Sequence, residues 1–139
     1  MISVIIPTFN EKNNIFKILS KLKKIKIISE IIFVDDDSSD GTYNEIIKYK
    51  TKKIKGYLRK SSIKDLSKSV VYGVKKAKSN NIVVMDCDLQ HNPNYIIKMW
   101  KKFNGSKYDI IIASRYKKNS KIAGLNFLRK FLSFGAAVL

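Results

Sequence analysis

The chain has 139 residues, of which 45% are hydrophobic, and this length and composition suit one domain with a substantial core. Its 28 lysine and arginine residues against 11 acidic residues give a net charge of +17. Such a surface should attract anions such as nucleic acid, acidic lipid headgroups or phosphorylated substrates, although a general bias toward lysine explains the charge equally well. The single cysteine excludes an internal disulfide.

The N-terminus does not resemble a signal peptide, and no apolar run reaches the roughly 18 residues needed to span a bilayer. We therefore expect a protein of a reducing, cytoplasmic compartment that is soluble or peripheral to a membrane.

The first predicted element is a short β-branched strand from Ile2 to Ile6, which Pro7 should close because proline has no backbone N–H to donate. Apolar residues then recur at helical spacing from Ile15 to Ile25, with lysines on the other face, which predicts an amphipathic helix. A second strand is predicted from Glu30 to Val34. Each strand ends in a polar loop.

The acidic run 35–42 (DDDSSDGT) follows the second strand directly. Three adjacent carboxylates repel one another unless a cation, a ligand donor or backbone amides relieve them. Ser39 or Asp40 is as well suited to capping the next helix as to a functional role. Asp35 and Asp36 lie closer to the strand end and are the better functional candidates.

The same alternation continues along the chain. It predicts a helix through Ile46 and Ile47, a weaker strand 54–58, helices over 66–77 and 92–103, and a strand 109–114, with Gly73 where close packing tolerates no side chain. Alternating strands and helices favour parallel pairing with right-handed crossovers, and hence an open, twisted α/β sheet covered on both faces. Ligands bind such sheets beyond the carboxyl ends of the strands.

The segment Val83 to His91 predicts a metal site at this edge. It reads as a short buried strand that ends in two carboxylates one residue apart, and alternate residues of an extended segment point to the same side. Asp86 and Asp88 could therefore face one ion while Cys87 turns away. Mg²⁺ and Mn²⁺ prefer such oxygen ligands and share them with substrate phosphates. An isolated match would more often be a polar loop.

The order of these signals resembles family 2 glycosyltransferases, and among them the polyprenol-phosphate sugar transferases of the dolichol-phosphate mannosyltransferase type. The similarity covers nearly the whole chain and rests on four segments in the expected order: 7–11 (PTFNE), 34–42 (VDDDSSDGT), 86–93 (DCDLQHNP) and 114–116 (SRY). The resemblance implies a single catalytic domain over 1–139 with the nucleotide-diphospho-sugar transferase (GT-A) fold.

It also implies metal-dependent, inverting transfer of a hexose, with mannose from GDP-mannose moving to a polyprenyl or dolichyl phosphate. The residues implied around the nucleotide sugar are Pro7, Phe9, Glu11, Phe33, Asp35, Asp86, Cys87, Asp88 and Arg115, with Phe33 and Cys87 contributing backbone atoms. Asp86 and Asp88, assisted by Gln90, would hold Mg²⁺ or Mn²⁺. Arg115, Arg129 and Ser133 would bind the lipid phosphate.

Two departures from the family pattern keep alternatives open. Residues 64–69 (KDLSKS) stand where lipid-linked members have a Gly-Leu-Gly run, and the chain is shorter than the family's catalytic domains. A non-catalytic nucleotide-sugar-binding remnant or fragment is therefore one alternative, and a family 2 transferase using UDP-glucose and another acceptor is a second. A nucleic-acid partner is not expected, because the sequence lacks an aromatic and arginine platform.

The apolar segment 124–139 has two interpretations. It either packs on the sheet or on a missing second half, or it forms an interfacial helix that presents a lipid acceptor. The second interpretation predicts peripheral contact with the cytosolic face of a membrane, which would be the endoplasmic reticulum in a eukaryotic host, or with a membrane-embedded partner subunit.

Overall fold

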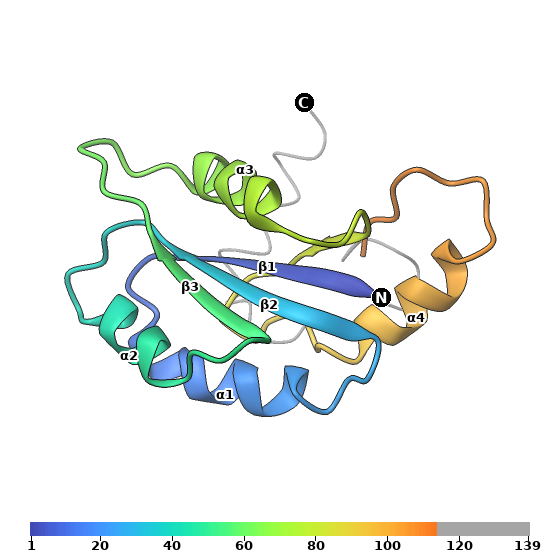
Figure 1. Ribbon diagram of the computed structural model, residues 1–139, viewed down its shortest axis with the longest axis horizontal. Helices are drawn as coiled ribbons and strands as arrows, with labels where there is room; N and C mark the ends of the chain where they lie inside the picture. The colour runs from blue at the N-terminus through green and yellow to red at the C-terminus, as the bar shows by residue number, and fades with distance from the viewer. Residues whose placement is uncertain (114–139) are drawn as a thin grey trace, which may run out of the picture.

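The computed structural model describes residues 1–113, in which strands and helices alternate as the sequence predicts (Figure 1). In chain order the elements are β1 (Ile2–Thr8), α1 (Lys12–Leu22), β2 (Ile28–Asp35), α2 (Thr42–Lys48), β3 (Ile54–Leu58), α3 (Leu66–Lys76), β4 (Ile82–Val84) and α4 (Tyr95–Phe103). None of the helices in this part of the chain is long and apolar enough to cross a membrane.

The four strands form one parallel sheet in the order β3-β2-β1-β4. Helices α1 and α2 lie on one face of the sheet, and α3 lies on the other (Figure 1). This arrangement confirms the predicted open α/β sheet covered on both faces, and it places the carboxyl ends of β1, β2 and β4 along one edge.

The core is built on the two central strands. Every residue of β1 is buried, as is every residue of β2 except Ser29. Their side chains alternate between faces: Ile6 and Phe33 belong to the larger cluster with α1, and Ile5, Ile32 and Val34 belong to a smaller cluster near α3. Because both faces are covered, the middle of each strand is apolar, and its polar residues lie near its ends.

Helix α3 packs on the sheet through its backbone at Gly73. A Cβ atom added to Gly73 would lie 2.5 Å from Cγ2 of Ile5 and 3.2 Å from Cγ2 of Val34, which leaves no room for a side chain. The close packing predicted at this glycine is confirmed.

The prediction that Pro7 ends the first strand is wrong. Strand β1 continues to Thr8, with Pro7 in register with Val34. The carbonyl oxygen of Ile5 accepts from Met85 N–H, so Pro7, two residues later, turns its nitrogen toward the same side. The ladder between β1 and β4 has already ended there, and the missing N–H therefore costs no hydrogen bond.

The strand predicted over 109–114 is not formed in its described part, 109–113. The side chains of Ile110 and Ile112 are 77% and 81% exposed, so neither gains the burial that stabilises a strand. The neighbouring β4 is also shorter and less buried than predicted, because it has three residues and Val84 is 50% exposed. An edge strand as short as β4 offers few backbone hydrogen bonds to a further strand.

Candidate active site

Three loops meet at the carboxyl edge of the sheet: 9–11 after β1, 36–41 after β2 and 85–91 after β4. The first two are joined by hydrogen bonds. Asn10 N–H donates to Ser38 Oγ (2.8 Å), Ser39 N–H to Asn10 Oδ1 (3.1 Å), Glu11 N–H to Thr42 Oγ1 (2.8 Å) and Lys12 N–H to Asp40 Oδ2 (3.1 Å). These bonds fix the two loops against each other.

Asp40 has the structural role that the sequence left open. Its carboxylate accepts from the backbone N–H and the hydroxyl of Thr42 as well as from Lys12 N–H, so it joins the first turns of α1 and α2. The N-cap position of α2 itself is Gly41, whose φ of 86° lies in the left-handed region that favours glycine. Ser39 makes its hydrogen bonds to Asn10 instead.

Asp35, predicted to contact the nucleoside, is completely buried at the end of β2. Its Oδ1 accepts from the hydroxyls of Thr8 (3.1 Å) and Ser38 (2.6 Å), and its Oδ2 accepts from Ser38 N–H (3.0 Å). All these donors are neutral. They hold the carboxylate in one orientation but do not neutralise its charge. The Asp35 carboxylate is therefore a hydrogen-bond acceptor of fixed orientation at the carboxyl end of β2.

The next two carboxylates have separate basic partners. Asp36 is 1% exposed, forms an ion pair with Arg59 and accepts from Asp65 N–H (2.6 Å). Asp37, at φ 57°, turns outward and forms an ion pair with Lys64 (2.9 Å). The repulsion expected within the acidic run is therefore relieved by contacts inside the protein, and Asp36 has a structural role.

The predicted metal motif lies in a turn. Strand β4 ends at Val84, and Asp88 Oδ1 accepts from Gln90 N–H (3.0 Å) around Leu89, whose φ is 61°. The expectation of one extended segment through Asp88 is therefore wrong. The burial still alternates as expected, because Cys87 is buried while Asp86 is exposed and Asp88 is partly exposed.

The surroundings of Cys87 show that Glu11 approaches this turn. Burial, and after it the negative charges of Glu11, Asp88 and Asp86, raise the pKa of the Cys87 thiol to about 12. These carboxylates come from the ends of two adjacent strands, β1 and β4. The charges of Glu11, Asp86 and Asp88 therefore all act on Cys87 at the edge that these two strands share.

The donor set of this turn fits a hard divalent cation that a substrate helps to hold. Within residues 1–113 no three or more His, Cys, Asp or Glu side chains are arranged to bind a metal by themselves. Asp86 and Asp88 supply oxygen donors, and the exposed Gln90 supplies an amide oxygen. One or two carboxylates completed by phosphates is the usual pattern for Mg²⁺.

The sequence also matches a known protein family. The sequence profile described as "Glycosyl transferase family 2" matches residues 3–134. The chain belongs to this family.

Two similar proteins align with almost the whole chain, and one solved structure shares its fold. The dolichol-phosphate mannosyltransferase of Pyrococcus furiosus is 40% identical over 141 residues, which cover 99% of this chain and 40% of the relative. An uncharacterised protein of Methanocaldococcus jannaschii is 33% identical over 141 residues, 97% of this chain and 58% of its own. The crystal structure of S. aureus TarS (residues 1–349) has a TM-score of 0.61 at 22% identity, covering 84% of this chain and 40% of that one.

The family 2 chain thus spans between 40% and 58% of the length of these proteins. The likeness to TarS supports the GT-A fold that the resemblance implied, and the parallel sheet agrees with it.

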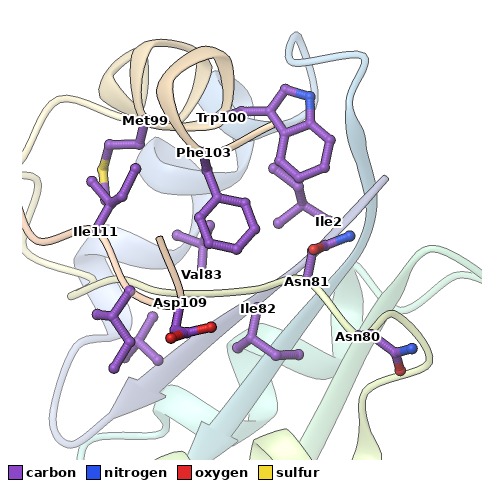
Figure 2. Close-up of a pocket in the computed structure, with 12 residues that line it drawn as sticks. Ile2, Asn80, Asn81, Ile82, Val83, Met99, Trp100, Phe103, Asp109 and Ile111 are labelled. Carbon is purple, nitrogen blue, oxygen red and sulfur yellow. The ribbon is translucent and has the colours of Figure 1, made fainter. Parts of the chain in front are cut away.

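Two cavities line the outer edge of β4. One, of about 390 Å³, is bordered by Asp86, His91 and Tyr95 as well as by apolar residues of β4 and α4. The other, of about 330 Å³, lies between β4 and the side chains of Met99, Trp100 and Phe103 on α4 (Figure 2). Of these two cavities, the first borders Asp86 of the predicted metal motif.

The remaining predicted site residues divide into three groups. Phe33 and Pro7 are buried inside the strands, so Phe33 could reach a ligand only through its backbone. Phe9 is 44% exposed at the edge. Arg115, Arg129 and Ser133 lie outside the described residues.

Sequence reasoning missed Arg59. It directly follows β3, and besides its ion pair with Asp36 it donates from Nε to Ser69 Oγ (3.2 Å) and from Nη2 to the carbonyl oxygens of Ile63 (3.2 Å) and Asp65 (3.4 Å). An arginine placed at the carboxyl end of one strand, beside an acidic run at the end of the next, was the signal that could have identified it.

Proposed function

We propose that this family 2 glycosyltransferase moves a hexosyl group from a nucleotide sugar to a polyprenyl phosphate, with mannose from GDP-mannose and dolichyl phosphate as the preferred pair. The supporting observation is the convergence of Glu11, Asp35 and the Asp86 to Asp88 turn at one edge of a GT-A sheet. The name of the P. furiosus relative supports the choice of sugar and acceptor. Because the chain spans 40% of that relative, the whole activity is part of the proposal.

The nucleoside would lie at the ends of β1 and β2. Asp35 is completely buried and held by Thr8 and Ser38, so a base or ribose donor would reach its carboxylate only after Ser38 moves aside. Phe9 offers an apolar surface beside it. The hydrogen bonds that lock loop 9–11 to loop 36–41 keep these groups in place before the ligand arrives.

The diphosphate would lie over the turn after β4. Asp86 and Asp88, with Gln90, would hold Mg²⁺ or Mn²⁺ there, and when bound the cation supplies positive charge to the departing diphosphate. Cys87, between the two carboxylates, stays buried. A polyprenyl phosphate is already an anion near neutral pH and needs no base, which agrees with a single displacement that inverts the anomeric centre.

Isothermal titration calorimetry with GDP-mannose and UDP-glucose, each with and without Mn²⁺, tests the donor and the cation. We expect binding of GDP-mannose that requires Mn²⁺ and is lost in the Asp86→Asn/Asp88→Asn double variant. Asp109→Asn is the matched control, because Asp109 is exposed and contacts the other cavity. Tighter binding of UDP-glucose would replace the proposed donor, and binding without Mn²⁺ would contradict the cation.

Transfer itself is tested by following radiolabelled mannose into a polyprenyl phosphate presented in detergent. We expect product from the wild-type chain, none after addition of EDTA and none with Asp88→Ala. Donor binding without any product, in the presence of metal and lipid, would instead identify the chain as a binding module of a larger activity.

A further inference from the structure

The outer side of α3 and of the loop before it carries apolar residues that nothing in the described part of the chain covers. Ile63 is 67% exposed, Leu66 51%, Val71 53% and Val74 42%. Ser69 and Gly73 press against the sheet, Val71 lies on the side of the helix away from it, and Leu66 lies at the exposed start of the row that meets the sheet. Figure 1 shows α3 alone on its face of the sheet among the labelled helices.

These side chains form one surface. Leu66, Val70 and Val74 follow one another at i, i+4 and i+8, and Val71 adjoins Val74 at i, i+3, so all four lie along neighbouring rows of the helix. Ile63 precedes the row in the loop. We call the exposed residues Ile63, Leu66, Val71 and Val74 the α3 apolar strip.

The stretch that carries the strip is rich in lysine, and the lysines of α3 lie on one side of the strip. Residues 60–78 contain six lysines, at positions 60, 64, 68, 75, 76 and 78, and one acidic residue, Asp65. All six lysines are exposed. Lys64 and Lys68 form ion pairs with Asp37 and Asp65, but the surface as a whole remains strongly positive.

We propose that the α3 apolar strip and its flanking lysines dock the protein on an anionic lipid bilayer. Exposed apolar side chains bordered by basic ones on a helix that lies flat on the fold are the chemistry of an interfacial helix, because the side chains enter the headgroup boundary while the lysines meet lipid phosphates. A bilayer suits the surface better than a polar protein partner, since the charge is almost entirely of one sign over this stretch.

This docking surface adjoins the candidate active site. Arg59 binds the carbonyl oxygens of Ile63 and Asp65 and pairs with Asp36, the residue after Asp35. The loop that carries the first residue of the strip is thereby tied to the sheet edge where the nucleotide sugar is proposed to bind. The inference goes beyond the proposed transfer and stands even if no transfer occurs.

Vesicle co-sedimentation tests it. We expect the chain to bind phosphatidylcholine vesicles containing phosphatidylglycerol, to bind pure phosphatidylcholine vesicles far more weakly, and to lose affinity as salt is raised. Lys68→Glu/Lys75→Glu should lower the partition coefficient by at least tenfold, because a lysine near an anionic surface contributes about fivefold. The matched control is Lys17→Glu/Lys21→Glu on α1, which changes net charge equally and should affect binding far less.

Separate variants test the contribution of the apolar side chains of the strip. Val71→Gln/Val74→Gln keeps helix-compatible side chains and should lower vesicle binding several-fold, whereas Phe16→Gln on α1, where the ring is 61% exposed, should not. Unchanged circular dichroism spectra and thermal midpoints would show that each variant is folded. Absence of vesicle binding, or equal losses in the α1 and α3 variants, would overturn the proposal.

Discussion

The guanidinium group of Arg59 and the carboxylate of Asp36 form an ion pair that is nearly inaccessible to solvent, with side chains 13% and 2% exposed. Together with the hydrogen bond from Asp65 N–H to Asp36, the pair joins the ends of β2 and β3 to the loop before α3. Removing one partner leaves a buried charge without compensation.

We therefore predict that Arg59→Met lowers the free energy of unfolding by about 3 to 5 kcal/mol, measured by urea denaturation. Lys64→Met is the control, because its ion pair with Asp37 is exposed and its loss should change the urea midpoint little. If both variants unfold at the same urea concentration, the Arg59 contact does not stabilise this edge.

Gly73 allows α3 to lie directly on β1, and replacing it should reverse the usual effect of alanine in a helix. In an open helix Gly→Ala is stabilising by about 1 kcal/mol. Here the added methyl group would lie 2.5 Å from Cγ2 of Ile5, so we predict a net destabilisation of about 1 to 3 kcal/mol for Gly73→Ala in thermal or urea unfolding.

Ser67→Ala, at an exposed position of the same helix, should be neutral or slightly stabilising. A Gly73→Ala variant as stable as Ser67→Ala would mean that α3 can move away from the sheet at little cost.

The features that depend on the spacing of hydrophobic residues could be predicted from the sequence. The hydrophobic spacing of α1, the apolar centre of β2 and the close packing at Gly73 could all be predicted, because each follows from which residues must be buried. The parallel pairing of the strands followed from the alternation of elements and the rules of parallel connections.

The wrong predictions concern positions whose conformation is decided by neighbouring parts of the fold. Pro7 stays in β1 because the ladder to β4 ends before it, which depends on the length of β4 and not on proline itself. Asp88 lies in a turn because Gln90 N–H binds it, and segment 109–113 is not a strand because its isoleucines remain exposed. The acidic run was correctly placed at the edge, but the partner of each carboxylate, above all Arg59, could not be derived from local sequence.

Glu30 should make stability depend on pH in the acid range. Its carboxylate is 4% exposed, and burial acts to raise its pKa. The donors from Lys55, Ser3 Oγ (2.6 Å) and Lys78 N–H (2.6 Å) outweigh burial and lower the pKa below the ordinary value of 4.5. A carboxyl group with a lowered folded-state pKa contributes stability above its unfolded pKa and loses it as the pH falls through the folded one.

We predict that Glu30→Gln is less stable than wild type at neutral pH and that the difference shrinks as the pH falls from 4.5 through the lowered folded-state pKa of Glu30. Urea unfolding at steps between about pH 7 and about pH 3 measures the difference. Glu45→Gln on α2, where the ion pair with Lys48 is far more exposed, provides the comparison. A difference that stays constant with pH would contradict the role of the Glu30 charge.

Cys87 should be unreactive toward thiol reagents while the protein is folded. Reaction requires the thiolate, and raising the thiol pKa from 9.0 to about 12 lowers the thiolate fraction about a thousandfold near pH 8. Burial of the side chain, which is 2% exposed, lowers the rate further. We predict that Ellman's reagent reacts at least a thousandfold more slowly with the native protein than with the urea-unfolded chain.

Because burial is the first cause of the raised pKa and the charge of Asp86 a minor one, Asp86→Asn should leave this protection nearly intact. Rapid labelling of native wild type would show that the turn after β4 opens readily, and it would place Cys87 at the surface of the substrate edge instead of beneath it.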